Sequence, residues 1–368
     1  MTDDSKFDLY LAFKRDAKEY IRNNYAQSPT LTKLFEDLGI TLSTVSVIII
    51  QQNAQDYVNY RFSHYEESVV DYIKSILPNV EIQLHNRNII SPYEIDIYLP
   101  QYHLGIECNP TITHNSTLPD PWSKQPKPYN YHKIKSQMAE TAGIFLFHIF
   151  GYEWNSRKSV IQSMLANLLG CSAHKVYARN TYVQSVDFST ATTFLQVNHR
   201  QGSTSAKLYL GLYGKKTDEL LSVMSFNHLR RSLGRIEFDS DVWELSRFCN
   251  VLNTNVVGGA SKLLKHFICN YNPTKIISFS DIAHTKGDLY STLGFTKVSE
   301  SAPGYVWVDL STDAYLHRVK CQKWHISKLF PNEQLDLTQT EKQIMSEHGY
   351  VQVFDSGVIR WELLNSKF

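Results

Sequence analysis

Residues 94–109 read EIDIYLPQYHLGIECN, and this stretch decides how the first half of the chain is expected to fold. Polar and apolar residues alternate before and after Pro100, which is the period of a half-buried strand. Pro100 and Gln101 make a tight turn, so the two strands form a hairpin. Glu107 then lies within one or two cross-strand pairs of Asp96. The hairpin is therefore expected to carry two or three carboxylates on its open face.

The sequence around the hairpin predicts an α/β arrangement. A polar, proline-rich loop covers residues 115–130, and apolar runs precede and follow it. The expected order is a helix at 63–77, strands at 93–99 and 103–109, a helix at 131–141, a strand at 143–150 and a helix at 158–169.

The residue types on this hairpin favour metal-assisted chemistry. Mg²⁺ prefers oxygen ligands, and a bound metal can activate water and stabilise charge on a scissile phosphate. His114, at the start of the polar loop, could act as a general acid or base, and Glu66 could reach the same site from the first helix. Alternating acids on a strand more often mark a solvent-exposed face. Here the glutamate lies in an apolar strand, and the loop that follows is long, which favours a functional site.

The motifs Ser63-x-x-Glu66, Glu94-Ile-Asp96 and Gly105-Ile-Glu107-Cys-Asn109, followed by His114, resemble the very-short-patch repair (Vsr) endonucleases. Their phage homing and Hef-like relatives share this PD-(D/E)XK, restriction-endonuclease-like fold. The resemblance spans about 63–170 and implies cleavage of double-stranded DNA with Mg²⁺ or Mn²⁺. It implies metal binding by Asp96, Glu107 and the backbone carbonyl of Cys108, and catalytic roles for Asn109, His114 and Glu66.

Two departures from that family bear on the expected mechanism. Asn109 stands where Vsr enzymes have a histidine, although an asparagine at this position resembles the phage relatives of the family. The usual lysine after Glu107 is missing, because Asn109 occupies its position. Water activation therefore differs from the family pattern, and an impaired nuclease remains an alternative.

Candidate DNA contacts lie on three segments outside the hairpin. His132 and Lys135, one turn apart on the helix at 131–141, could face a phosphate backbone. Residues 1–58 are expected to be helical, and 31–46 have the layout of a helix-turn-helix, with Ser43 and Thr44 at the start of its second helix. A helical hairpin packed on the nuclease is the alternative. The remaining candidates are Arg230 and Arg231, beside Arg235, although such charge runs usually form solvated surface.

Residues 175–310 predict a second α/β unit. Strands are expected at 207–213, 220–226, 243–249, 275–280 and 305–309, and helices at 259–270 and 287–293. Residues 312–368 are expected to form a basic appendage with helices at 315–329 and 339–347 and a strand at 358–363.

Within the second unit, Gly258, Gly259 and Ala260 open a helix, where free N–H groups can bind an anion. This loop and the segment from Tyr290 to Phe295 resemble the coenzyme-A pyrophosphate loop and the Tyr-x-x-x-Gly-Phe segment of GNAT acyltransferases. The resemblance implies a GNAT-like domain in which Tyr290 is the general acid. A glycine pair at the start of a helix reflects tight packing of the helix on a strand more often than anion binding.

Four further positions of this unit are candidate functional residues: His199, Gly202, Arg247 and Asp281. Asn255 replaces the usual glutamine or arginine of the pyrophosphate loop, so coenzyme A is not expected as a cofactor.

The composition is that of an ordinary globular protein with two or three domains. The chain has 368 residues, 42% of them hydrophobic, with a net charge of only +1, which by itself does not favour nucleic-acid binding. Five cysteines without a CxxC pair favour a reducing compartment, and the longest apolar run is too short to span a membrane. A phage-encoded protein in the cytoplasm of a bacterial host is expected; its oligomeric state is left open.

The resulting expectation is an Mg²⁺-dependent DNA endonuclease with a GNAT-like second half and an N-terminal helical module. Two alternatives stay open. One is a GNAT-type acyltransferase or nucleic-acid-modifying enzyme that uses the nuclease fold as a DNA clamp, and the other is a non-catalytic DNA-binding protein.

Overall fold

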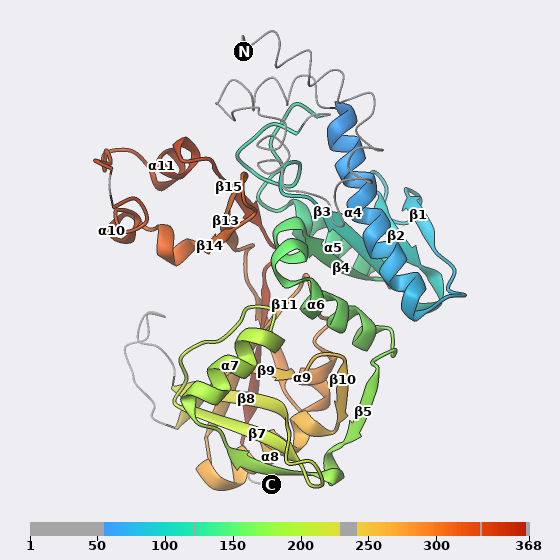
Figure 1. Cartoon of the computed structure of the whole chain (residues 1–368), viewed down its shortest axis with the longest axis vertical. Coiled ribbons are helices and arrows are strands. Elements are labelled where there is room, and N and C mark those ends of the chain that lie inside the picture. Colours follow the sequence, from blue (N-terminus) through green and yellow to red (C-terminus); the bar gives the residue numbers. More distant parts are fainter. Residues whose placement is uncertain (1–54, 121–122, 229–240, 332, 366–368) are drawn as a thin grey trace. The chain divides into compact units, whose positions relative to one another are not determined.

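The computed structural model describes residues 55–120, 123–228, 241–331 and 333–365 (Figure 1). The chain forms two compact units, each built from two separate stretches. Unit 1 contains the chain up to Ser156 together with 304–355, and unit 2 contains 157–303 together with 356–368. The structure thus divides the chain differently from the expected ranges 63–170, 175–310 and 312–368.

Unit 1 is built on a four-stranded sheet in the order β1-β2-β3-β4. Its strands are β1 (Gln83–Asn86), β2 (Ile95–Leu99), β3 (Leu104–Asn109) and β4 (Phe145–Phe150), and only β3 and β4 run parallel. The predicted hairpin is present, with Ile97 opposite Ile106. Every residue of β3 and β4 is buried. Strand β3 lies inside the sheet, whereas β4 is an edge strand.

Three helices accompany this sheet: α4 (Gln55–Ile76), α5 (Tyr131–Thr141) and α6 (Gly151–Leu168). The prediction for α5 is confirmed at both ends. Helix α6 begins earlier than expected and is kinked at Arg157, whose φ of −136° is not helical. The chain passes from unit 1 to unit 2 at this kink.

A second, three-stranded sheet completes unit 1, in the order β14-β13-β15. Its strands are β14 (Tyr315–His317), β13 (Tyr305–Asp309) and β15 (Tyr350–Phe354), and the fully buried Trp307 lies at the centre of its core. A 3-10 turn η4 (Arg318–Cys321) and the short helices α10 (Lys323–Ile326) and α11 (Glu341–Glu347) follow. The expected helix at 315–329 is wrong over its first half, because Tyr315 to His317 pair with β13.

Unit 2 is built on a seven-stranded sheet in the order β12-β16-β11-β9-β8-β7-β6. Its strands are β6 (Thr181–Ser185), β7 (Leu208–Gly214), β8 (Leu220–His228), β9 (Val242–Asn250), β11 (Lys275–Asp281), β12 (Thr296–Glu300) and β16 (Val358–Leu364). All neighbours are antiparallel except β9 and β11.

Helices cover both faces of this sheet. Helix α8 (Gly259–Tyr271) buries Leu263 and Phe267 against Met224 and Phe226 on one face. Helix α7 (Phe188–Asn198) packs with Tyr209 and Val223 of the other face. We call these the α8 face and the α7 face. The short helix α9 (Asp288–Thr292) follows β11, and a small parallel pair joins β5 (His174–Tyr177) to β10 (Thr254–Val257).

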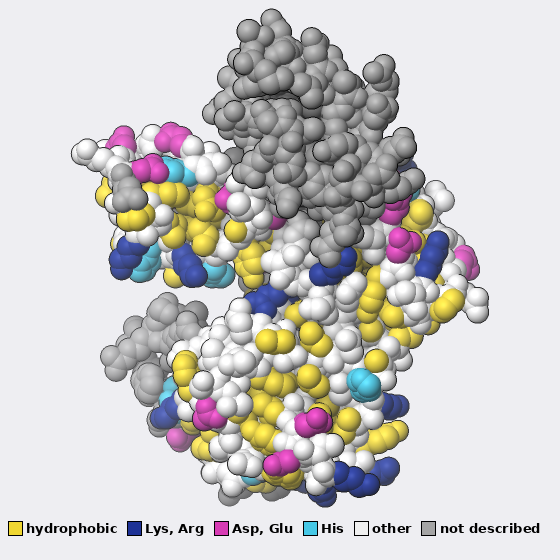
Figure 2. All heavy atoms as spheres, in the orientation of Figure 1, with side chains coloured by type: hydrophobic (Ala, Val, Ile, Leu, Met, Phe, Trp, Pro, Cys, Tyr) yellow, Lys and Arg dark blue, Asp and Glu magenta, His cyan; other side chains and the backbone are white. Residues whose placement is uncertain are grey.

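Several expectations fall on residues outside the described part of the chain. Ser43 and Thr44 of the possible helix-turn-helix lie there, and so do Arg230, Arg231 and Arg235. In the part that is described, no helix has both the length and the apolar character needed to cross a membrane. Figure 2 shows basic and acidic side chains in small separate groups on the face in view.

Candidate functional sites

The carboxylates of the unit 1 hairpin lie close together, as expected, but they differ in burial: Glu94 and Asp96 are half-buried and Glu107 is buried. Asp96 accepts a hydrogen bond from the backbone N–H of Cys108 at 2.7 Å. Glu107 is fully buried and forms an ion pair with Lys135 of α5, which is itself only 3% exposed. Burial, with the Asp96 charge nearby, raises the pKa of Glu107 to about 8.

Lys135 and His132 do not face outward, so the expectation that they contact a DNA backbone is corrected. Burial opposes the charge of Lys135, but the carboxylates of Glu107 and Asp96 outweigh it and raise the lysine pKa. His132 is 2% exposed, and its Nδ1 lies 2.7 Å from the carbonyl oxygen of Phe354. Both side chains of α5 are therefore bound inside unit 1.

Asn109 and His114 contact other histidines rather than Asp96. Because His132 donates from Nδ1, its Nε2 is an acceptor, and His114 Nδ1 lies 3.2 Å from it. Burial, then the neighbouring His132, lowers the pKa of His114 well below its usual value. The Asn109 amide lies 3.3 Å from His148 Nδ1. Asn109 Nδ2 also donates to the backbone carbonyl of Glu107 at 3.4 Å, and the catalytic roles of Asn109 and His114 stay predictions.

A different group of potential metal ligands surrounds Asp96. Ligand atoms of His85, Glu94 and Asp96 all lie within 4.8 Å of one another. Glu66 of α4 is adjacent, with Oε2 3.7 Å from His85 Nε2. Burial, then the charges of Asp96 and Glu94, raises the pKa of Glu66 to about 8. The sequence reasoning missed His85 because the four-residue strand β1 has no apolar alternation.

This group differs from the predicted ligand set of Asp96, Glu107 and Cys108. Asp96 belongs to both sets. Glu107 is bound to Lys135, and the metal-binding role predicted for the Cys108 carbonyl stays a prediction. A carboxylate and imidazole donor set suits Mn²⁺, and its oxygens also suit Mg²⁺.

In unit 2, the parallel strands β9 and β11 pair over only part of their length. Their register runs from Val242 opposite Lys275 to Leu245 opposite Ser278, and then ends. A bulge in β9 falls at the same point, opposite Ser225 and Phe226 of β8. Beyond Leu245, β9 continues to Asn250 along β8 alone. The facing edges of β9 and β11 are therefore unpaired beyond the pair Leu245–Ser278, which we call the last shared rung.

The Tyr290 hydroxyl lies at this last shared rung. Ser278 Oγ is 2.8 Å from the carbonyl oxygen of Leu245 and 3.0 Å from the hydroxyl of Tyr290. Tyr290 stacks on Trp361 of β16, with ring centroids 5.4 Å apart, which fixes the ring on the α8 face. Burial raises the pKa of Tyr290, so the phenol is protonated at neutral pH.

The glycine loop lies at the edge of the sheet where β9 ends. A Cβ at Gly259 would come within 3.0 Å of Leu212 and 2.9 Å of Val256, so close packing requires glycine there. Leu212 is in register with Ser222 of β8, and Ser222 with Asn250, the last residue of β9. Gly258, with φ of +77°, leaves the first N–H groups of α8 free of a side-chain cap.

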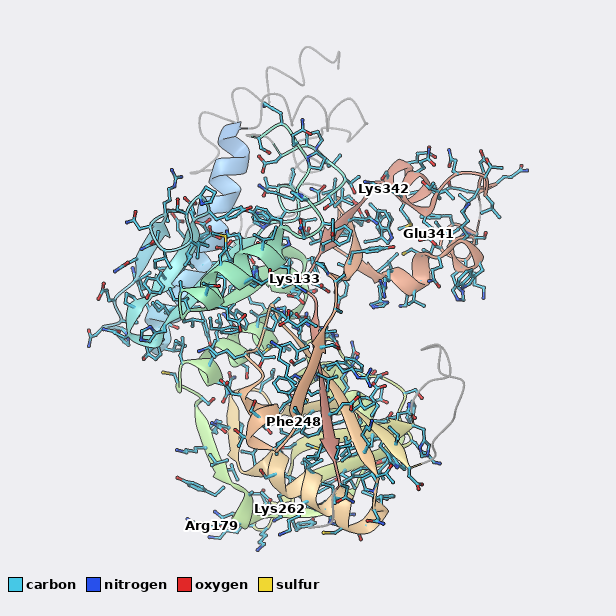
Figure 3. The ribbon with its side chains drawn as sticks, turned by 180° about the vertical axis from the view of Figure 1, so that it is seen from behind. Lys133, Arg179, Phe248, Lys262, Glu341 and Lys342 are labelled. Carbon is cyan, nitrogen blue, oxygen red and sulfur yellow. The ribbon has the colours of Figure 1, made fainter. Side chains whose placement is uncertain are left out.

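Three sequence candidates of unit 2 meet on the α7 face. Phe248 packs on the α8 side (Figure 3), so Arg247 and Cys249 point the other way, and Cys249 packs with the α7 side. Arg247 Nε lies 3.4 Å from the carbonyl oxygen of Gly202. Asp281, at the end of β11, pairs with Arg200 and lies 3.3 Å from His284. The turn after α7 therefore connects the two strands beyond their last shared rung.

Comparisons with known proteins match only part of the chain. No family model matches the sequence. No curated protein matches it either. Among solved structures, a ribosomal-protein-S5-alanine acetyltransferase from Vibrio fischeri is 13% identical and covers 33% of this chain and 82% of its own, with a TM-score of 0.26. A GNAT-family acetyltransferase from Bacillus anthracis is 11% identical and covers 51% and 96%, with a TM-score of 0.26. An acetyltransferase related to histone acetyltransferase HPA2, from Corynebacterium glutamicum, is 14% identical and covers 33% and 88%, with a TM-score of 0.25.

The expected enzyme class, an Mg²⁺-dependent DNA endonuclease, is corrected by this comparison. The matching solved structures carry acetyltransferase names, and none of those described is a nuclease. The chain has a mixed α/β fold whose solved neighbours are acetyltransferases. Double-stranded DNA as a partner and the cytoplasm as a location stay predictions.

Proposed function

We propose that unit 2 catalyses acyl transfer from a coenzyme-A thioester, in the manner of GNAT enzymes. The observation that carries the proposal is the Tyr290 hydroxyl at the point where β9 and β11 stop pairing. Open strand edges beyond that point can hydrogen-bond an extended ligand, because their N–H and C=O groups have no ladder partner. The phenol then stands beside the end of such a ligand.

The residues of the glycine loop fit the diphosphate of coenzyme A. The first N–H groups of a thirteen-residue helix have no side-chain cap, and Gly258 and Ser261 are exposed. A helix N-terminus favours negative charge through both its free donors and its dipole. Asn255, in place of glutamine or arginine, removes one long side chain and leaves these backbone donors in place.

A bound thioester would supply an activated carbonyl carbon to an acceptor amine. The amine nitrogen forms the new bond to that carbon while the carbon–sulfur bond breaks, and the amine loses a proton to solvent. The protonated phenol of Tyr290 can give a proton to the departing sulfur and regain one from solvent, which balances the proton lost by the amine. Ser278, held by the Leu245 carbonyl, positions the phenol at 3.0 Å.

The test of donor binding is calorimetry with coenzyme A on Ser261→Glu. This change puts a carboxylate into the first turn of α8, where it suits the helix dipole but repels a diphosphate. Binding is expected to weaken by at least about tenfold, while the fold is kept. The matched control is Ser189→Glu, the same change at an exposed position in the first turn of α7. Equal coenzyme-A affinity in both variants, or no binding to the wild type, would reject the proposal.

A second prediction concerns the adenosine end of the same ligand. The parallel pairing of β5 and β10 sets Tyr177 beside Val257, directly before Gly258. Lys175 and Arg179 lie over the Tyr177 ring, at 5.7 and 5.1 Å from its centroid. Figure 3 shows Arg179 near Lys262 of α8, whose Nζ is 2.8 Å from the Ala178 carbonyl oxygen. Aromatic and cationic groups together suit a phosphorylated adenosine.

We therefore expect Arg179→Gln to weaken the binding of coenzyme A more than the binding of 3′-dephospho-coenzyme A. A factor of about three to ten is expected for the phosphorylated ligand, as for an exposed charged contact. The measurement is competitive calorimetry with the two ligands. If the variant weakens both equally, Arg179 contributes nothing specific to the 3′-phosphate.

As a second candidate function, we propose that His85, Glu94 and Asp96 of unit 1 bind a divalent cation, which would displace Arg87 from its ion pair with Glu94. It implies no nuclease activity.

With Mn²⁺ at about a hundred times its dissociation constant, binding would stabilise unit 1 by about 2.7 kcal/mol. Thermal unfolding in Mn²⁺ against EDTA measures this. Asp96→Asn, which can still accept the Cys108 N–H, is expected to abolish the shift. Asp71→Asn, at an exposed position of α4, is expected to keep it. A shift that survives in Asp96→Asn would place the metal elsewhere.

A further inference from the structure

Three arginines and a histidine gather on the α7 face of unit 2, beside the open edge of β9. Arg247 lies on β9 two positions beyond its last residue paired with β11. Arg200 follows α7, and Arg157 lies at the kink of α6. Burial, then the charges of Arg247, Arg200 and Arg157, lowers the pKa of His199 to about 3. The histidine is therefore neutral at physiological pH.

Each of these side chains is held in place by local contacts. The Arg247 guanidinium lies 2.7 Å from the Ser246 carbonyl oxygen and 3.4 Å from that of Gly202. Arg157 donates to the Gln196 carbonyl oxygen, and Arg200 pairs with Asp281. Preorganised donors of this kind lose little freedom when a ligand arrives.

The orientation of His199 adds one more donor. Its Nδ1 accepts the backbone N–H of Gln201 at 3.2 Å, so the proton of the neutral ring is on Nε2. The ring therefore presents an N–H, as the arginines do. The carboxylate that pairs with this group is Asp281, which binds Arg200 and lies 3.3 Å from His284.

The charge balance of this group favours a phosphate over a carboxylate. Among the groups named here, three guanidinium groups gather with the one carboxylate of Asp281. A phosphate monoester carries about −1.5 to −2 charges and three strong acceptor oxygens, whereas a carboxylate carries a single charge. Arginine forks also match the geometry of phosphate oxygens.

We propose that Arg157, Arg200, Arg247 and His199, which we call the arginine cluster, bind the phosphate group of the acyl acceptor. This inference rests on the proposed acyl transfer and names the chemistry of its second substrate. Arg247 and Asp281 point to the α7 face, and Tyr290 stands on the α8 face. A phosphate held by the cluster would direct an acceptor amine toward the last shared rung from the side opposite Tyr290.

The test is calorimetry with O-phosphoethanolamine, ethanolamine and inorganic phosphate, all without an acyl donor. O-phosphoethanolamine is expected to bind at least about tenfold more tightly than ethanolamine, the same amine without the phosphate. Arg247→Gln and His199→Gln are expected to weaken it by about tenfold each, since each removes or alters a donor to the same group. Arg318→Gln, an exposed arginine of η4, is the matched control and should bind like the wild type.

Inorganic phosphate that binds with the same dependence on Arg247 supports the proposal, because it shows that the phosphate itself is recognised. Equal binding of the two amines, or unchanged binding in both variants, overturns it. The outcome is separable from the proposed function. Arginine-dependent phosphate binding in a protein that fails to bind coenzyme A would reject acyl transfer and keep the phosphate site. Coenzyme-A binding without phosphate binding would do the reverse.

Discussion

The Lys135→Met variant is expected to lose about 3–5 kcal/mol of its free energy of unfolding, because it leaves the buried Glu107 without a partner. Glu107 has no exposed surface, and one of its carboxylate oxygens already lacks a hydrogen-bond partner among the described residues. Removing the ammonium group removes the charge that offsets this burial. Urea denaturation followed by circular dichroism measures the loss.

Two variants separate the ion pair from the packing of α5. Lys133→Met changes a partly exposed lysine of the same helix (Figure 3) and is expected to cost less than about 1 kcal/mol. The double variant Lys135→Met with Glu107→Gln removes both charges and is expected to recover much of the stability. A loss for Lys135→Met no larger than that for Lys133→Met would show that the pair has little energetic weight.

The Tyr290→Phe variant is expected to reduce acyl transfer by at least about a hundredfold, the usual contribution of a general acid. The ring would keep its stacking on Trp361, so coenzyme-A affinity is expected to change little. The measurement is thiol release from acetyl-coenzyme A with O-phosphoethanolamine, with the affinity measured separately.

The control for this prediction is Tyr182→Phe. Tyr182 lies on β6, away from the last shared rung, and the change removes a hydroxyl that donates to Asp218. It is expected to keep the wild-type rate. A Tyr290→Phe rate within a few-fold of the wild type would remove Tyr290 from the proposed proton transfer.

Local patterning predicts much of the secondary structure. Alternation in residues 94–109 correctly gives the β2–β3 hairpin, and the polar-to-apolar periods give α5 and α8 closely. The sequence predicts the glycine loop and Tyr290 as candidate site residues through their resemblance to segments of GNAT acyltransferases.

Patterning cannot decide which polar residues are buried. Lys135 and His132 have the spacing of an exposed helix face, yet they turn inward because Glu107 and the Phe354 carbonyl need partners. His85 gives no signal, since its strand is short and polar. The gathering of Arg200 and Asp281, 81 positions apart, depends on the fold as a whole.

The sequence also does not reveal which sheet a strand will join. Strand β13 was expected in the second unit and belongs to the first, while β16 belongs to the second. Strand periodicity records which side chains are buried, and both sheets bury apolar residues in the same alternation.

Strand β16 has a consequence for how the protein is made. It is among the last described segments of the chain, yet it lies inside the sheet, between β11 and β12. While the ribosome is still synthesising residues before Val358, β11 and β12 have no partner on these sides, and Trp361 is not yet there to stack on Tyr290. Unit 2 therefore cannot complete its sheet during elongation through residues 157–303. Until β16 is synthesised, the edges of β11 and β12 that it will cover stay unpaired in the nascent chain. Unpaired strand edges are the surfaces to which chaperones or neighbouring chains bind.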